Sequence, residues 1–113
     1  MPPAIEIRRE VTPDAVILRP EGEIDLARSP ELRLKLRTEV DAAPKRLVID
    51  LSRVAYMDSS GVATLVEALT RARGNQTRLV LAELQPKVRS IFSISRLDTV
   101  FPIAPSVDAA MTL

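Results

Sequence analysis

The sequence of 113 residues contains neither cysteine nor histidine, and only three glycines. The lack of cysteine excludes disulfides, thiolate zinc sites and cysteine nucleophiles, and it is consistent with a cytoplasmic location. The lack of histidine removes the commonest general base and the commonest metal ligand. The glycines, Gly22, Gly61 and Gly74, are too far apart to form a glycine-rich phosphate-binding loop. We therefore expect no catalytic residues, no cofactor and no metal, and we predict that the chain is not an enzyme.

Long apolar runs and an excess of charge are also missing. No apolar run approaches the ~20 residues that span a bilayer, and the first six residues lack the basic and apolar regions of a signal peptide. The net charge of +1 favours neither nucleic-acid binding nor binding to a membrane surface. Hydrophobic residues make up 46% and charged residues 27%, as is typical of a globular protein. We expect one domain over residues 1–113, without membrane insertion or direct contact with nucleic acid.

The sequence Asp-Ser-Ser-Gly at residues 58–61 is the centre of the chain's most informative stretch. An apolar strand at residues 47–49 leads into it, and apolar residues at helical spacing follow it. This spacing predicts a helix with Leu65 and Leu69 on its buried face. Asp58 is suited to cap the helix, because a carboxylate oxygen can accept hydrogen bonds from the free N–H groups of the first turn.

If Asp58 is the cap, Ser60 is the second helical residue and its hydroxyl can face water. Gly61 leaves room for another group to approach the backbone closely. The positive end of the helix dipole favours an added anion, so Ser60 is well suited to carry a phosphate. The alternative is that these four residues only cap the helix, and the four residues taken alone favour that simpler interpretation.

The rest of the chain shows further strand and helix patterns. A hairpin is expected from residues 5–9 and 15–19, after which residues 20–22 interrupt the strand. A helix is expected to begin with Ser29 as its cap and Pro30 at its first position. The other expected elements are a helix from Ser60 to Gly74, a strand at residues 78–82, a helix from Pro86, an edge strand at residues 99–103 limited by Pro102, and a short helix capped by Ser106.

The alternation of strands and helices from residue 47 to residue 103 requires parallel pairing with right-handed crossovers. Together with the hairpin, it predicts an α/β fold with a mixed β-sheet of about four to five strands and about four packed helices. Ligand and partner sites in such sheets lie beyond the carboxyl ends of the strands. The loop at residues 52–60 is expected at such an end.

The stretch from residue 49 to residue 61 resembles the signature of STAS domains, and more narrowly that of bacterial anti-sigma factor antagonists. The matching residues are Ile-Asp-Leu-Ser at 49–52, Val54, and Met-Asp-Ser-Ser-Gly at 57–61. The Gly-x-x-Asp segment that ends at Asp25 is also similar. Three positions or properties depart from the family: Ala63 and Arg96 stand where glycine is usual, and the pI of about 8.2 is slightly basic.

The resemblance implies a STAS fold and a phosphorylation site at Ser60, with Ser59 as the alternative. It also implies a partner-binding surface that includes Asp25, Asp58, Ser59 and Gly61. For Asp25, a loop aspartate without a functional role is an equal alternative.

The function that the resemblance implies is that of an anti-sigma factor antagonist, a binding module switched by phosphorylation. The unphosphorylated chain would sequester an anti-sigma factor that is also a serine kinase, and the chain phosphorylated on Ser60 would release it. A PP2C-type phosphatase would act on the phosphorylated form. The alternative is a STAS subunit of a lipid-type ABC transporter or of a signalling assembly. A small enzyme or nucleotide-binding protein is disfavoured by the missing histidine and glycine-rich loop.

Overall fold

The computed structural model describes residues 4–113, so residues 1–3 of the expected domain, where no signal peptide is predicted, lie outside the described residues. The strands are β1 (Glu6–Val11), β2 (Val16–Ile24), β3 (Arg46–Asp50), β4 (Val54–Met57), β5 (Arg78–Ala82) and β6 (Ile103–Ala104). The helices are α1 (Ser29–Asp41), α2 (Ser59–Gly74), α3 (Pro86–Ile94), α4 (Val107–Ala110) and the short 3₁₀ helix η1 (Leu97–Thr99). Within this part of the chain, no helix combines the length and apolar character needed to cross a membrane.

The six strands form a mixed sheet in the order β1-β2-β3-β5-β6, and β4 pairs with the second half of β2. β1 and β2 are antiparallel, and the other pairs are parallel. The predicted α/β fold with a mixed sheet is therefore confirmed. The expected loop at residues 52–60 was wrong in part, because it contains β4. This strand is only four residues long, and two exposed residues separate its buried ends, Val54 and Met57, so it lacks a regular alternation.

Strand β2 continues through residues 20–22, where the sequence predicts an interruption, and that prediction is wrong. Its first half pairs with β3 and its second half with β4. The register shifts between Gly22 and Glu23, and Gly22 adopts a φ of 104°. Glycine reaches this conformation without steric cost, so the strand bends at this point instead of ending.

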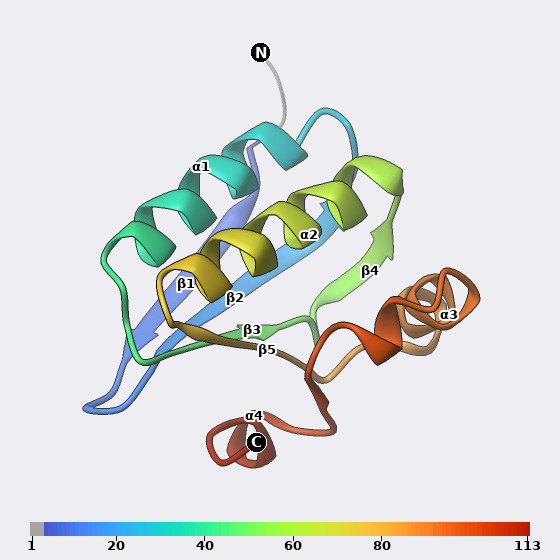
Figure 1. The fold of residues 1–113 in the computed structure, drawn as a ribbon. Helices are drawn as coiled ribbons and strands as arrows, with labels where there is room; N and C mark the ends of the chain where they lie inside the picture. Colours follow the sequence, from blue (N-terminus) through green and yellow to red (C-terminus); the bar gives the residue numbers. More distant parts are fainter. Residues whose placement is uncertain (1–3) are drawn as a thin grey trace.

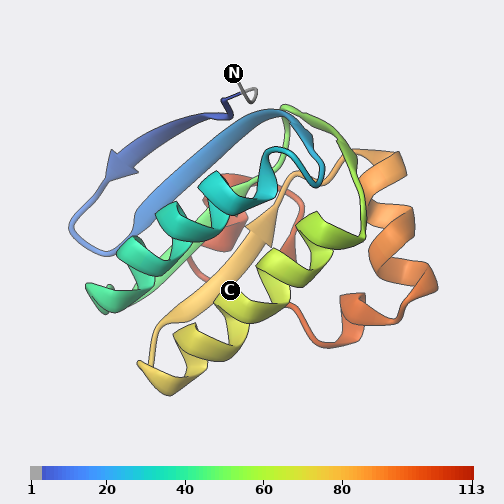
Figure 2. The ribbon, with the colours of Figure 1, turned by 90° about the horizontal axis from the view of Figure 1, so that it is seen from above.

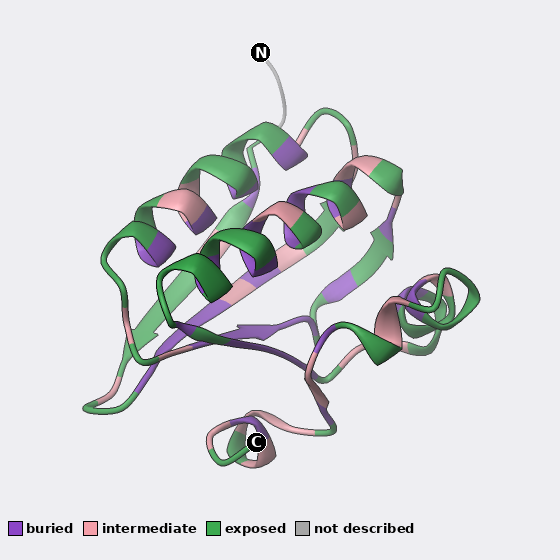
Figure 3. Cartoon of the chain, in the orientation of Figure 1, coloured by how far each residue is buried: buried purple, intermediate pink, exposed green. Residues whose placement is uncertain are grey.

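Helices α1 and α2 lie side by side on one face of the sheet, and α4 lies on the opposite face (Figures 1 and 2). Helix α3 packs beside β4. The sides of α1 and α2 that face the sheet are buried and their outer sides are exposed (Figure 3). Leu65 and Leu69 are buried as predicted.

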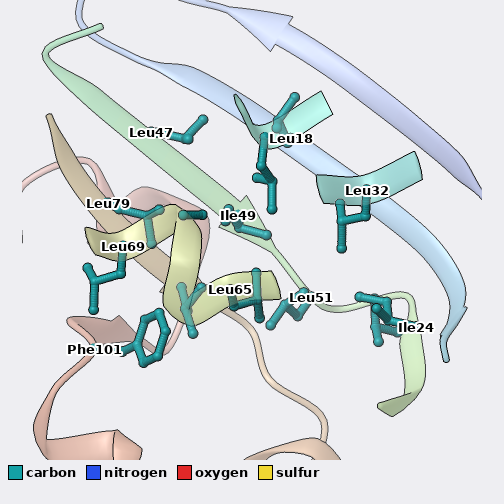
Figure 4. Close-up of a cluster of buried hydrophobic side chains, with 14 of the residues drawn as sticks. Leu18, Ile24, Leu32, Leu47, Ile49, Leu51, Leu65, Leu69, Leu79 and Phe101 are labelled. Atoms are coloured by element: carbon teal, nitrogen blue, oxygen red, sulfur yellow. The ribbon is translucent and has the colours of Figure 1, made fainter. Parts of the chain in front are cut away.

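The central strands are covered on both faces. The leucine and isoleucine side chains of β3 and β5 belong to the large cluster beneath α1 and α2 (Figure 4). Val48 and Val80, which alternate with them, belong to a smaller cluster that includes Ala110 of α4. Buried parallel strands of this kind have continuous apolar sequences, which explains the runs at residues 47–49 and 79–81.

The beginning of α1 differs from the prediction. Ser29 is the first helical residue, Arg28 takes the cap position, and no side chain caps the helix. The backbone N–H of Ser29 donates to the carbonyl of Asp25 at 2.8 Å, and the N–H of Arg28 donates to the Asp25 carboxylate at 3.0 Å. The expected serine cap is therefore wrong, because the chain already turns between Asp25 and Ser29 and Ser29 lies inside the helix.

The C-terminal part contains a shorter strand than expected. The helix η1 occupies residues 97–99, and β6 pairs only with β5, at the edge that Pro102 predicts. Ser106 caps α4 as predicted, because its hydroxyl accepts from the N–H of Ala109 at 3.0 Å. Arg96 has a φ of 60°, a left-handed conformation that glycine adopts most easily, and this is a position where the resembled family has glycine.

Candidate functional site

The candidate site lies where two parallel strands end. Ile24 at the end of β2 is in register with Met57 at the end of β4, and the backbone N–H of Asp58 donates to the carbonyl of Ile24 at 3.2 Å. Asp25 and Asp58 directly follow these two residues. The structure thus brings Asp25 next to the loop that carries the serine pair, at the carboxyl ends of β2 and β4.

Asp58 caps α2, as the sequence predicts. Its Oδ1 accepts from the N–H of Ser60 at 2.9 Å and from the N–H of Gly61 at 3.3 Å. The same oxygen accepts from the hydroxyl of Ser60 at 2.5 Å. The hydrogen bond from the Ser60 hydroxyl is the main cause that lowers the pKa of the Asp58 carboxyl. Hydrogen bonds from backbone N–H groups, including that of Leu26, lower this pKa further, whereas partial burial raises it. The start of α2 therefore carries an ionised carboxylate bound to a serine hydroxyl.

The two serines face different hollows of the surface. Ser60 is half-buried and lines a groove of about 590 Å³ between α1 and α2. Ser59 is exposed and lines a more apolar hollow of about 500 Å³ between the start of α2 and α3. Ala63 lines both and separates them. The Ser60 hydroxyl, expected to face water, donates to the Asp58 carboxylate from a half-buried residue.

Gly61 is buried against the strand ends. A Cβ at this position would lie 2.6 Å from Cγ of Met57, 2.8 Å from Cγ2 of Ile24 and 2.9 Å from the Ile24 carbonyl oxygen. The close approach expected at Gly61 therefore occurs, but the approaching groups belong to this chain. Gly61 lets the first turn of α2 pack directly on β2 and β4, and so it positions Asp58 and Ser60.

Asp25 is engaged within its own loop. Its carboxylate accepts from the backbone N–H of Arg28 at 3.0 Å and from the Arg28 guanidinium at 2.6 Å. Asp58, in contrast, forms no ion pair within residues 4–113. The two aspartates lie close together, but only Asp58 carries a charge that no arginine balances.

The sequence did not point to the residues on the α1 side of the groove. Arg33 and Arg37 stand one turn apart on α1, and both bind Glu67 of α2. Leu26 and Leu34 also line the groove and are 75% and 67% exposed. The two arginines are four residues apart, so the sequence of α1 indicates that they lie on the same side of the helix. It does not indicate that they form ion pairs with a residue of α2.

Comparison with known proteins identifies the family. The STAS domain family matches residues 6–110, which is nearly all of the chain. The chain belongs to the STAS domain family. This STAS domain is 37% identical over 90 residues to BtrV of Bordetella bronchiseptica, which is assigned as an anti-sigma factor antagonist; the match covers 80% of this chain and 78% of BtrV.

Solved structures agree with this assignment. The crystal structure of an anti-sigma factor antagonist from Mycobacterium paratuberculosis superimposes with a TM-score of 0.88 and 28% identity, over 96% of this chain and 92% of that one. The Bacillus cell fate determinant SpoIIAA, solved in its phosphorylated form, gives a TM-score of 0.70 and 25% identity, over 93% of this chain and 95% of SpoIIAA. BtrV and the mycobacterial protein are named as anti-sigma factor antagonists, not as enzymes or transporter subunits.

Proposed function

We propose that this STAS domain is an anti-sigma factor antagonist that binds an anti-sigma factor while Ser60 is unmodified and releases it when Ser60 is phosphorylated. The proposed anti-sigma factor is a serine kinase that modifies Ser60, and a PP2C-type phosphatase restores the binding form. The cycle takes place in the cytoplasm. The relatives named as anti-sigma factor antagonists support this proposal, and so does the phosphorylated form of SpoIIAA.

The observation that carries the proposal is the 2.5 Å hydrogen bond from the Ser60 hydroxyl to the Asp58 carboxylate at the start of α2. A phosphorylated serine oxygen has no proton to donate, so this bond is lost. The phosphate also brings a charge of about −1.5 to −2 close to an ionised carboxylate. Like charges at this distance repel, so modification of one atom changes both the hydrogen bonding and the charge of the surface.

The surface beside Ser60 supports a binding role. Leu26 and Leu34 are largely exposed, and both line the groove that Ser60 lines. A partner that covers these side chains would remove water from Ser60 as well. A phosphate enclosed there close to the Asp58 carboxylate would be costly, and a thousandfold loss of affinity requires only ~4 kcal/mol. Release therefore needs no refolding of the domain.

The site assignment is tested by phosphopeptide mass spectrometry after incubation with the cognate kinase and ATP. We expect the phosphate on Ser60. Ser59 is the more exposed residue and serves as the internal control, because a kinase guided by exposure alone would modify it. Modification of Ser59 alone would contradict the assignment.

The switch is tested by calorimetric titration of the kinase with Ser60→Ala and Ser60→Asp. Ser60→Ala cannot be phosphorylated, so we expect it to bind persistently even with ATP present. Ser60→Asp adds negative charge where the helix dipole tolerates it, and we expect much weaker binding with an intact fold. Ser59→Ala and Ser59→Asp are the matched controls and are expected to bind more nearly like wild type. Equal, tight binding of both Ser60 variants would rule out the charge switch and would instead suit a structural subunit.

A further inference from the structure

We propose that Arg33 of α1 is the internal receptor of the phosphate on Ser60, and that its guanidinium leaves Glu67 to pair with the phosphate when Ser60 is modified. This inference rests on the phosphorylation of Ser60 proposed above. It concerns how the modified domain holds the new charge. No covalent bond changes in this step, because one ion pair is exchanged for another.

The position of Arg33 comes from the pairing of α1 with α2, which run side by side (Figure 2). Arg37 binds Glu67 and Asp41 binds Arg71, so partners on the two helices are 30 residues apart in the sequence in both cases. The same offset places Arg33 level with residue 63. This level is about 4.5 Å along the helix axis from Ser60 and about 6 Å from Glu67, at 1.5 Å per residue.

Ser60 and Glu67 are presented to Arg33 on the same side of α2. They are seven residues apart, which is close to two full helical turns, and both line the groove that Arg33 also lines. The guanidinium of Arg33 now points to Glu67, with Nε 2.5 Å from Oε2. Because Ser60 is no farther along the axis than Glu67, the flexible side chain of Arg33 can turn to either residue.

Glu67 keeps a partner when Arg33 leaves. Nη2 of Arg37 lies 2.6 Å from Oε1 of Glu67, on the other carboxylate oxygen. Arg33 and Arg37 together lower the pKa of the Glu67 carboxyl, as expected for one carboxylate between two cations. The three side chains carry one surplus positive charge in the groove, so the exchange leaves no unpaired carboxylate.

Asp58 determines the direction in which the phosphate moves. It lines the hollow on the α3 side of α2, together with Ser59. Repulsion from Asp58 drives a phosphate on Ser60 away from that side and into the groove of about 590 Å³ that Arg33 lines. The Arg33 guanidinium already contacts both oxygens of Glu67, through Nε at 2.5 Å and Nη2 at 3.2 Å. A phosphate with a charge of about −1.5 to −2, which Arg33 does not share with Arg37, accepts the same pair of hydrogen bonds with a stronger charge attraction.

The test uses protein with phosphoserine encoded at position 60 during translation, so that it does not depend on any kinase. Phosphorus-31 NMR follows the second ionisation of the phosphate across pH. We expect the titration midpoint of the wild type to lie several tenths of a pH unit below that of Arg33→Gln. Arg71→Gln is the matched control, because it removes one exposed arginine from the same helix pair outside the groove.

If the phosphate in Arg33→Gln titrates at the same midpoint as in the wild type, the proposal is overturned. An equal rise of the midpoint in Arg71→Gln would also overturn it, because the effect would then come from net charge alone. Thermal unfolding confirms that each variant is folded, and Arg33→Lys, which keeps the charge but loses the planar fork, is expected to fall between wild type and Arg33→Gln. A kinase that never modifies Ser60 would refute the proposed function, whereas an unchanged midpoint would refute only the role of Arg33.

Discussion

The beginnings of α1 and α2 lie at the same end of the sheet, and each follows an aspartate at the end of a strand. At α1, Asp25 binds the backbone and the guanidinium of Arg28, so its charge is balanced by an arginine three residues away. At α2, Asp58 binds backbone N–H groups and the hydroxyl of Ser60. At the start of α1 the aspartate is paired with an arginine, whereas at the start of α2 the aspartate keeps a negative charge, unpaired within residues 4–113, that is bound to a group that can be modified.

This difference shows why the second start is suited to a switch. A phosphate placed beside Asp25 would meet the Arg28 guanidinium, which can pair with it. Beside Asp58 it breaks a hydrogen bond and adds like charge at the same time.

The two helix starts can be compared only if α1 and α2 are held by the same rigid core. Leu69 of α2 is 4% exposed and belongs to the large cluster beneath the helices, whereas Leu34 of α1 is 67% exposed. We expect Leu69→Ala to lower the free energy of unfolding by roughly 2–5 kcal/mol, as large-to-small core substitutions do. Leu34→Ala is the control, with an expected change within about 0.5 kcal/mol. Chemical denaturation measures both, and a loss below about 1 kcal/mol for Leu69→Ala would mean that α2 is rotated from the orientation described.

The start of α2 also depends on a close approach that α1 does not need. In Gly61→Ala the new methyl group would overlap the Ile24 carbonyl oxygen and two side chains. We expect a loss of about 1–3 kcal/mol, because a backbone oxygen cannot move aside as a side chain can. Gly74→Ala, at the other end of α2, meets no atom within 4 Å and is expected to be neutral or stabilising by up to about 1 kcal/mol. Equal unfolding free energies for the two variants would contradict the packing of α2 on β2 and β4.

Much of this arrangement could be predicted from the sequence. The order of helices and strands, the buried positions of α2 and the capping role of Asp58 follow from local patterns that one segment contains by itself. The resemblance also singled out Ser60. These features depend on periodicity and on hydrogen bonds between neighbours in the sequence, which is why they could be predicted.

The features that escaped prediction depend on contacts between distant segments. Strand β4 forms because β2 bends at Gly22 and offers its second half for pairing. Ser29 does not cap α1 because the turn from Asp25 to Ser29 places Ser29 inside the helix. The ion pairs of Arg33 with Glu67 join residues 34 positions apart. Local propensity contains no information on these contacts, so only the folded chain shows them.

The two helix starts should respond differently to loss of the residues that were candidates for their caps. Asp58→Ala removes an acceptor of two backbone N–H groups, and we expect a loss of about 0.5–2 kcal/mol in the free energy of unfolding. Ser29 is 6% exposed, but its hydroxyl makes no capping hydrogen bond, so we expect Ser29→Ala to cost less than Asp58→Ala. Denaturant titration of both variants measures the difference. A larger loss for Ser29→Ala would contradict the assignment of the caps.

The smallest expected effect is the pH dependence that Asp58 confers on stability. Hydrogen bonds to its carboxylate, led by that from Ser60, lower the pKa of Asp58 in the folded state. The unfolded chain therefore takes up this proton at a higher pH than the folded chain does. The resulting stability is fully present above the ordinary carboxyl pKa of about 3.9, and it is lost as pH falls through the lower pKa of the folded state.

Asp58→Asn isolates this contribution, because asparagine keeps an oxygen acceptor for the first turn of α2 and does not titrate. We expect the wild type to exceed Asp58→Asn in unfolding free energy by a constant amount at neutral pH. That difference should shrink as the pH is lowered below about 4, because the wild type then loses the charge that its partners stabilise. Thermal unfolding of both proteins from neutral to acidic pH measures it. A difference that stays constant, or grows towards acid, would show that the Asp58 carboxylate is not stabilised by the helix start, and the contrast between the two helix starts would fail.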